Sequence, residues 1–167
     1  MILMAASAGA DQISNDAFAI TLPAGFGEFT KQAQTTDGKE GKIETTNWIS
    51  KSPTGEAVVV TMSKMSGKIL APEKIINGTR DALLKSLGAT IDSEEKLTGD
   101  LPGTGVTFHN KSAFLRSRLA VKGDRLYQVL YVGRTAEQRV LPVVGEMFQS
   151  FHISAPPAVA QTSSAGH

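Results

Sequence analysis

One stretch of the sequence decides the fold, Arg125-Leu126-Tyr127-Gln128-Val129-Leu130-Tyr131-Val132. Successive side chains of a β-strand point to opposite faces of a sheet, so alternate residues share a face. The two alternating sets are Leu126, Leu130 and Val132 on one face, and Tyr127, Val129 and Tyr131 on the other. A strand that is apolar on both faces is typical of the centre of a sheet that is covered on each side. The stretch therefore predicts a central strand with a packed layer on each face.

A second strand-like segment precedes this stretch and predicts a hairpin over residues 113–132. Gly123-Asp124 lies between the two strands, and glycine in the first central position suits a two-residue turn. That turn fixes the register, which pairs Lys122 with Arg125, Ala120 with Tyr127, Arg118 with Val129 and Arg116 with Tyr131. Arginines of the first strand should therefore share one face of the sheet with tyrosines of the second.

The rest of the sequence predicts further strands and two helices around this hairpin. Pro72 in a first-turn position and Gly88 as a stop indicate a helix over residues 72–87. A second helix is expected over residues 141–150, after a short turn. Strands are expected near residues 18–22, 42–51, 56–64, 89–97 and 105–110, a closing strand near 151–153, and a polar loop over 24–41. This order predicts an α+β protein, an α/β/α sandwich with a central, mostly antiparallel sheet and two main helices.

Four segments of the sequence, taken in order, resemble one known family. They are Phe18-x-Ile20-x-Leu22-Pro23 followed by Gly25-Phe26, the helical segment 72–87 ending in Gly88, Gly123-Asp124-Arg125-Leu126-Tyr127-Gln128-Val129, and Phe148-x-x-Ser150-Phe151-x-Ile153. Over about residues 17–153 the sequence is similar to the PsbP-like domains, named for the extrinsic subunit of photosystem II. The resemblance implies a domain that binds or assists a protein partner and is not an enzyme, and many bacterial members are exported. A photosystem role is not implied, because no residue-level motif marks a manganese-cluster partner.

The composition argues against several classes of function. The 167 residues carry a formal net charge of +1, without the basic excess that nucleic-acid binding normally requires. There is no cysteine, which excludes disulfides, thiol nucleophiles and thiolate zinc sites. No apolar segment approaches the length of a membrane-spanning helix, so no transmembrane segment is expected.

The titratable residues show no spacing that is typical of a metal or cofactor site. Three histidines share no ligand spacing with one another or with a carboxylate, namely His109, His152 and His167. The acidic group formed by Asp92, Glu94 and Glu95 lacks the glycine of a calcium loop and is expected to be a solvated strand edge. We therefore expect neither a metal nor another cofactor.

The two ends of the chain differ in composition from the rest. Residues 1–10 contain a short apolar segment and then Ala8-Gly9-Ala10, which has the small-x-small form of a signal cleavage site. We expect a signal-peptide remnant and export to the periplasm or the extracellular space; an alanine-rich N-terminus without signal function is the alternative. Residues 155–167 have no periodicity and two adjacent prolines, which favours a flexible tail. Residues 11–154 would then form a single PsbP-like domain.

The predicted hairpin supplies the candidate ligand- or partner-binding residues, Arg116, Arg118, Tyr127 and Tyr131. A guanidinium beside a tyrosine ring can form a cation–π contact, and paired arginines can hold a carboxylate or phosphate group. The alternative is a structural face, partly covered by a helix, along which the arginine stems pack. The expected function is a non-catalytic, exported binding or accessory domain that recognises a protein partner or a small anionic ligand. The alternatives are a hydrolase whose site is assembled only in three dimensions, and a structural module tethered by its tail.

Residues 1–10 and 155–167 should be dispensable for folding, because neither segment has the periodicity of a core element. Deleting both segments is expected to leave the midpoint of thermal unfolding nearly unchanged, as measured by circular dichroism. A fall of several degrees would mean that one of them packs on the folded domain, contrary to this prediction.

Overall fold

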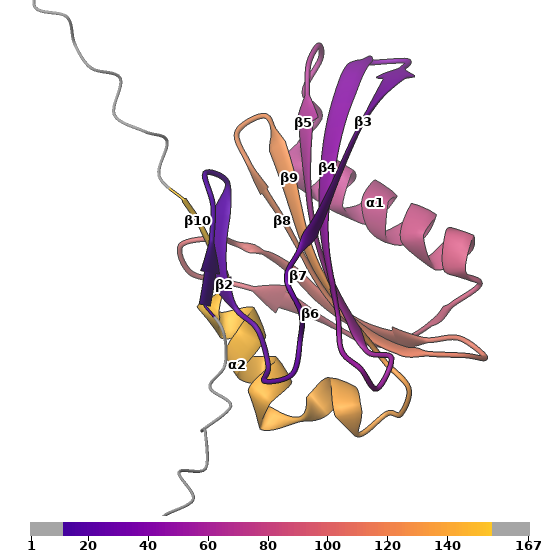
Figure 1. Ribbon diagram of the computed structural model, residues 1–167. Coiled ribbons are helices and arrows are strands. Elements are labelled where there is room, and N and C mark those ends of the chain that lie inside the picture. Colours follow the sequence, from indigo (N-terminus) through magenta and orange to yellow (C-terminus); the bar gives the residue numbers. More distant parts are fainter. Residues whose placement is uncertain (1–11, 155–167) are drawn as a thin grey trace, which may run out of the picture.

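Residues 12–154 are described by a computed structural model of the chain. They form three layers, with a large sheet between one helix on one face and a helix plus a small sheet on the other (Figure 1). The expected signal-peptide remnant, residues 1–10, and the expected tail, residues 155–167, lie outside the described residues. The α/β/α sandwich predicted from the sequence is confirmed.

The large sheet has seven strands, and every pair of neighbours is antiparallel. In spatial order the strands are β3 (Thr30–Gly38), β4 (Gly41–Lys51), β5 (Ala57–Met65), β9 (Arg125–Gly133), β8 (Phe114–Lys122), β7 (Gly103–His109) and β6 (Thr90–Leu97). β9 is the fourth of the seven strands. The stretch that is apolar on both faces therefore lies at the centre of the sheet, as predicted.

The hairpin of β8 and β9 has the predicted register. Gly123 has a left-handed φ of 61° at the first central position of the turn, a conformation that glycine adopts readily because it lacks a Cβ. The observed pairs include Lys122–Arg125, Ala120–Tyr127, Arg118–Val129 and Arg116–Tyr131. A slip of one residue would turn every side chain of a strand to the other face. This turn therefore decides which side chains meet each covering layer.

α1 (Pro72–Leu87) covers one face of the sheet and packs over β8. Pro72 opens the helix and Gly88 ends it in a left-handed conformation (φ 56°), as the sequence predicts. Buried Ile76 forms a hydrophobic cluster with Leu119 of β8 and Leu126 of β9. The first apolar set of β9 therefore meets this helix.

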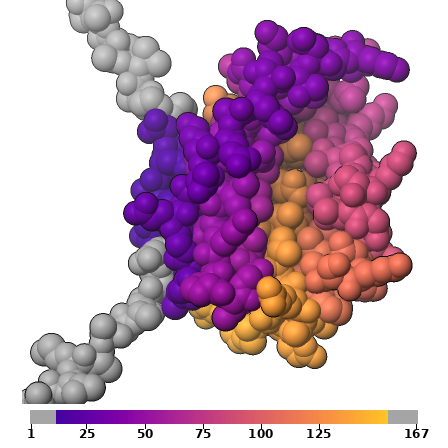
Figure 2. Space-filling view, turned by 45° about the vertical axis from the view of Figure 1, so that its right-hand side comes forward, coloured from indigo at the N-terminus to yellow at the C-terminus, as the bar shows by residue number. Residues whose placement is uncertain are grey.

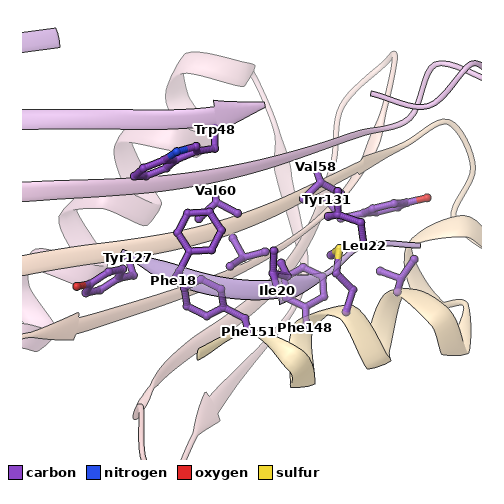
Figure 3. Packing of buried hydrophobic residues seen from close by; sticks show 13 residues of the cluster. Phe18, Ile20, Leu22, Trp48, Val58, Val60, Tyr127, Tyr131, Phe148 and Phe151 are labelled. Atoms are coloured by element: carbon purple, nitrogen blue, oxygen red, sulfur yellow. The ribbon is translucent and has the colours of Figure 1, made fainter. Parts of the chain in front are cut away.

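The opposite face of the sheet carries the main hydrophobic core (Figure 3). Its covering layer consists of α2 (Pro142–Ser150) and a small antiparallel sheet of β1 (Gln12–Ser14), β2 (Phe18–Thr21) and β10 (His152–Ile153). The core residues are Phe18, Ile20, Leu22, Trp48, Val58, Val60, Tyr127, Val129, Tyr131, Val144, Met147, Phe148 and Phe151. The Phe18 ring lies edge-on to Trp48, with their centroids 5.0 Å apart, and 5.8 Å from the ring of Phe151. Aromatic side chains thus hold the small sheet against the large one.

A short 3₁₀-helix, η1 (Gln138–Val140), precedes α2 and provides the predicted short turn. Gln138 N–H donates to Thr135 Oγ1 (3.3 Å), and Thr135 N–H donates to Gln138 Oε1 (3.1 Å). These are the two reciprocal bonds of a capping box. Pro142 then opens α2, in the helix position where its missing N–H has no consequence.

One long strand differs from the sequence prediction. Residues 30–38 form β3, within the segment 24–41 for which the sequence predicts a loop. All nine of its residues are exposed, so β3 lacks the alternating apolar pattern by which a half-buried strand is recognised. Its position at the edge of the sheet and its backbone pairing with β4 account for the strand.

Replacing Phe18 with alanine should destabilise the protein strongly, because this side chain is fully buried against Trp48 and Phe151. Removing a buried phenylalanine side chain costs about 3–5 kcal/mol of unfolding free energy. Denaturant unfolding measures the change. Val140→Ala is the matched control: Val140 is 64% exposed, and its replacement should change the free energy by about 0.5 kcal/mol or less. A loss below about 1 kcal/mol for Phe18→Ala would contradict the core described above.

Candidate functional site

The four residues predicted as a binding site lie on the face of the β8–β9 hairpin that meets α2. Arg116 and Arg118 belong to β8, and Tyr127 and Tyr131 belong to β9, paired as the sequence predicts. The two tyrosines are buried in the main core, with 3% and 1% of their surface exposed (Figure 3). The turn chemistry therefore gives the correct neighbours, but the tyrosine rings belong to the core.

The hydroxyl of Tyr131 is bonded inside the protein. It donates a hydrogen bond to Glu56 Oε1 (2.8 Å), just before β5. Burial, together with this bond, raises the pKa of Tyr131. Hydrogen bonds from Thr54, Tyr131 and Ser52 lower the pKa of the Glu56 carboxyl, against the opposing effect of its own burial. This hydrogen bond connects β9 to the residue just before β5, so the Tyr131 hydroxyl forms a structural contact.

Both arginines contact Phe148 of α2. The guanidinium carbon of Arg116 lies 4.9 Å from the ring centroid of Phe148, a cation–π contact. Arg118 donates from Nη2 to the carbonyl of Leu101 (2.9 Å) and from Nη1 to that of Phe148 (3.4 Å). Burial lowers the pKa of the Arg118 guanidinium, and its Nε has no hydrogen-bond partner in the described part of the chain.

A hollow of about 230 Å³ lies beside these arginines. Glu95, Thr98 and Gln149 line it together with Arg116 and Arg118. Within residues 12–154, neither guanidinium forms a salt bridge. The structure therefore brings the two predicted arginines to one hollow and keeps the two predicted tyrosines in the core.

A larger groove, of about 690 Å³, lies on the opposite face of the sheet, between α1 and the strands β4 and β5. The helix side consists of Ile75, Gly78, Thr79, Ala82, Leu83 and Ser86. These positions recur every three or four residues and so form one face of α1. The sheet side consists of Ile43, Ser63, Met65, Leu126 and Gln128. The groove is thus mostly apolar along its length.

One end of this groove is polar and carries three lysines. Lys39 lies in the β3–β4 turn, Lys68 in the β5–α1 loop and Lys74 in the first turn of α1. The turn and the loop are in contact, since Lys68 N–H donates to the carbonyl of Glu40 (3.2 Å). Glu40 also contributes a carboxylate to the lining. Positive charge therefore predominates at this end.

Gly78 lies in the helix face that lines the groove. A Cβ placed on Gly78 would meet no atom within 4 Å, so there is open space beside the helix at this point. Glycine in a helix interior costs about 1 kcal/mol relative to alanine. The groove is not predicted from the sequence, and this helical glycine is a local signal that points to it.

Asp92, His109 and Arg139 form a cluster at the β6 edge of the sheet. Asp92 lies at a bulge, where the register of β6 shifts between Ile91 and Ser93. Its carboxylate accepts a hydrogen bond from Arg139 and lies 2.7 Å from His109 Nδ1. Burial alone would raise the pKa of Asp92, but Arg139 and His109 together lower it. Asp92 is exposed on the edge strand together with Glu94 and Glu95, as the sequence predicts, and its carboxylate is also bonded to Arg139 and His109.

The described residues contain neither a metal-binding cluster nor a membrane-spanning helix. Residues 12–154 contain no group of three or more histidine, aspartate or glutamate side chains that could hold a metal ion. In the same residues, no helix is both long enough and apolar enough to cross a bilayer.

The sequence matches no family model and no curated protein. The structure is similar to the solution structure of cyanobacterial PsbP (CyanoP) from Synechocystis sp. PCC 6803, with a TM-score of 0.57. The two sequences are 14% identical, and the similarity covers 92% of this chain and 97% of that chain. At this identity the similarity concerns the fold, and a shared fold does not by itself carry a function. The chain therefore has a PsbP-like fold, as the resemblance in the sequence implied.

Proposed function

We propose that this protein is a non-catalytic binding domain that holds a small amphipathic anion in the groove between α1 and the strands β4 and β5. The observation that carries the proposal is the groove itself, which combines about 690 Å³ of space and apolar walls with three lysines at one end. Small-molecule sites are typically clefts of about 300–1,000 Å³ with apolar walls and a few polar groups that orient the ligand.

The apolar walls of the groove are suited to the apolar body of the ligand, and the lysines at one end are suited to its anionic group. Ile75 and Leu83 on the helix and Met65 on the sheet offer apolar contact to a hydrocarbon or aromatic body. Burial of that body contributes about 25 cal/mol per Å² of apolar surface removed from water. Lys68 and Lys74 attract a carboxylate, phosphate or sulfonate group, and this attraction orients the ligand more than it adds affinity. If residues 1–10 direct export, the ligand would be met in the periplasm or outside the cell.

The distribution of acid–base groups favours a binding domain over a hydrolase. Asp92 bonds to His109, and Glu56 bonds to Tyr131, and both pairs lie outside the groove. The groove offers lysine ammonium groups, the Glu40 carboxylate, hydroxyl groups and a side-chain amide beside apolar walls. Among the described residues, its serine hydroxyls bond to another hydroxyl or to backbone carbonyls and not to the Glu40 carboxylate or a lysine ammonium group. Such groups orient and hold a ligand, whereas hydrolysis needs a nucleophile next to a base.

The hollow beside Arg116 and Arg118 is a second candidate site, for a small anion or for a carboxylate of a protein partner. Its support is that two guanidinium groups face one hollow without a salt bridge among the described residues. Guanidinium groups bind carboxylate and phosphate through paired, charge-assisted hydrogen bonds. Glu95 also lines the hollow and opposes the binding of an anion.

Gly78→Phe should block the groove, because the new ring would occupy the open space beside α1. Binding of the fluorescent amphiphile anilinonaphthalene sulfonate should weaken by about tenfold or more, which corresponds to about 1.4 kcal/mol. Gly78→Ala is the matched control: it should keep the binding and raise the unfolding free energy by up to about 1 kcal/mol. A folded Gly78→Phe protein that binds the probe as the wild type does would contradict the assignment of the groove.

Replacing Lys68 and Lys74 together with glutamine tests whether their positive charge contributes to binding in addition to the apolar walls. The double variant should bind anilinonaphthalene sulfonate more weakly, by a factor of about three to ten. It should bind the uncharged analogue N-phenylnaphthylamine as the wild type does. Equal binding of the sulfonate by both proteins would contradict the preference for an anion.

Replacing Arg116 and Arg118 together with glutamine should abolish binding of inorganic phosphate, if their hollow holds an anion. Isothermal titration calorimetry at moderate salt measures the binding. The charge-matched control is Lys111→Gln with Lys122→Gln, at two exposed positions outside the hollow. The double variant also loses the contact between Arg116 and Phe148, worth about 0.5–1 kcal/mol of stability. Phosphate binding that survives in the double variant would show that the two arginines are structural.

A further inference from the structure

β3 presents an unpaired edge of the large sheet. Among the described residues it pairs with β4 alone, and its register with β4 is continuous from Thr30 to Gly38. All nine of its residues are exposed. Figure 2 shows the β3–β4 hairpin, in indigo to purple, on the outside of the molecule. Such an edge leaves a row of backbone N–H and C=O groups available to another strand.

Every second residue of β3 directs its backbone groups away from β4. Ser66 N–H donates to the carbonyl of Lys42 (2.9 Å), so the backbone of Lys42 is directed toward the β5 side. Asp37 lies opposite Lys42. In an antiparallel pair, the residue opposite such a position directs its own backbone groups outward. The outward residues of β3 are therefore Lys31, Ala33, Thr35 and Asp37.

The other edge of the sheet is protected against strand pairing, and β3 is not. β6 has a bulge between Ile91 and Ser93 and carries Glu94 and Glu95. Bulges and clustered charges are the usual means by which proteins prevent edge strands from pairing. β3 has no bulge and no proline, and its two charged side chains have opposite signs.

We propose that two copies of this chain associate through β3 in antiparallel orientation, as a symmetric dimer that continues the large sheet. The register that pairs all nine residues places Thr30 opposite Gly38 of the second copy and Gln34 on the two-fold axis. In that same register Lys31 faces Asp37 of the second copy, and symmetry forms this ion pair twice. Outward residues then lie opposite outward residues, as an antiparallel ladder requires.

The neighbours of both charged residues are compatible with this pairing. Lys31 Nζ lies 5.8 Å from the ring centroid of Trp48, and Asp37 lies opposite Lys42 within its own chain. No like charge is therefore directly opposed across the new strand pair. An exposed ion pair contributes about 0.2–1 kcal/mol, so the charges select the register while backbone hydrogen bonds hold the strands. One strand pair is a small interface, which corresponds to a weak dimer that forms at micromolar concentration or above.

Charge reversal tests the register. Lys31→Asp or Asp37→Lys alone places like charges opposite each other at both ends of the strand pair, and either variant should dimerise about tenfold more weakly than the wild type, or more weakly still. The double variant, Lys31→Asp with Asp37→Lys, restores opposite charges and should dimerise as the wild type does. Sedimentation velocity at about 0.1 mM protein measures the association. Glu95→Lys, a charge reversal on the opposite edge strand, is the matched control and should leave the dimer unchanged.

Thr35→Pro provides a second test that does not depend on charge. Proline at this position removes an outward N–H group and leaves the bonds between β3 and β4 in place, so the variant should be a folded monomer by circular dichroism and sedimentation. A wild-type protein that is monomeric at this concentration would overturn the proposal. Single charge reversals that leave the dimer as stable as in the wild type would overturn it too, as would a double variant that dimerises no better than the single variants.

Discussion

β9 is apolar on both faces, so its side chains are buried only if a layer packs on each face. The two layers that cover the large sheet meet this requirement. Tyr127, Val129 and Tyr131 belong to the main core on the side of α2 and β2. On the other side Leu126 clusters with Ile76 of α1. Each large apolar side chain that becomes buried stabilises the fold by about 1.5–3 kcal/mol. Without either layer, half of this central strand would be exposed to water.

The two layers cover unequal parts of the sheet, and the groove follows from that inequality. On the side of the main core, β2, β10 and α2 act together, and Trp48 of β4 and Val60 of β5 are buried beneath them. On the other side a single helix packs over β8. The strands β4 and β5 therefore have one face in the core and one face along the groove. Small residues on the adjacent side of α1, such as Gly78 and Ala82, keep that space open.

The sequence predicts those features that depend on local pattern and misses those that depend on distant segments. The apolar alternation of residues 125–132 and the turn at Gly123 are local signals, and the position of β9 and its register with β8 follow from them. β3 has no buried face, so no periodicity marks it. The turn at Gly123 correctly predicts the strand partners of Tyr127 and Tyr131. Their burial is not predicted, because it depends on β2 and α2, which are distant in the sequence. The groove could not be predicted either, because it exists only where α1 stops covering the sheet.

Both ends of the described chain belong to the small sheet. Gln12 pairs with Thr21 and Ile153 pairs with Phe18, so β1 and β10 flank the four residues of β2. Neighbouring strands are about 4.8 Å apart, so β1 and β10 are about 10 Å apart across β2. Both run antiparallel to β2, so the described chain begins beside Thr21 and ends beside Phe18, at opposite ends of β2. Figure 1 shows this small sheet on the side of the large sheet away from α1. A fusion partner attached at either end would therefore lie on the side of the large sheet away from α1, and the groove beside α1 would stay open to a ligand.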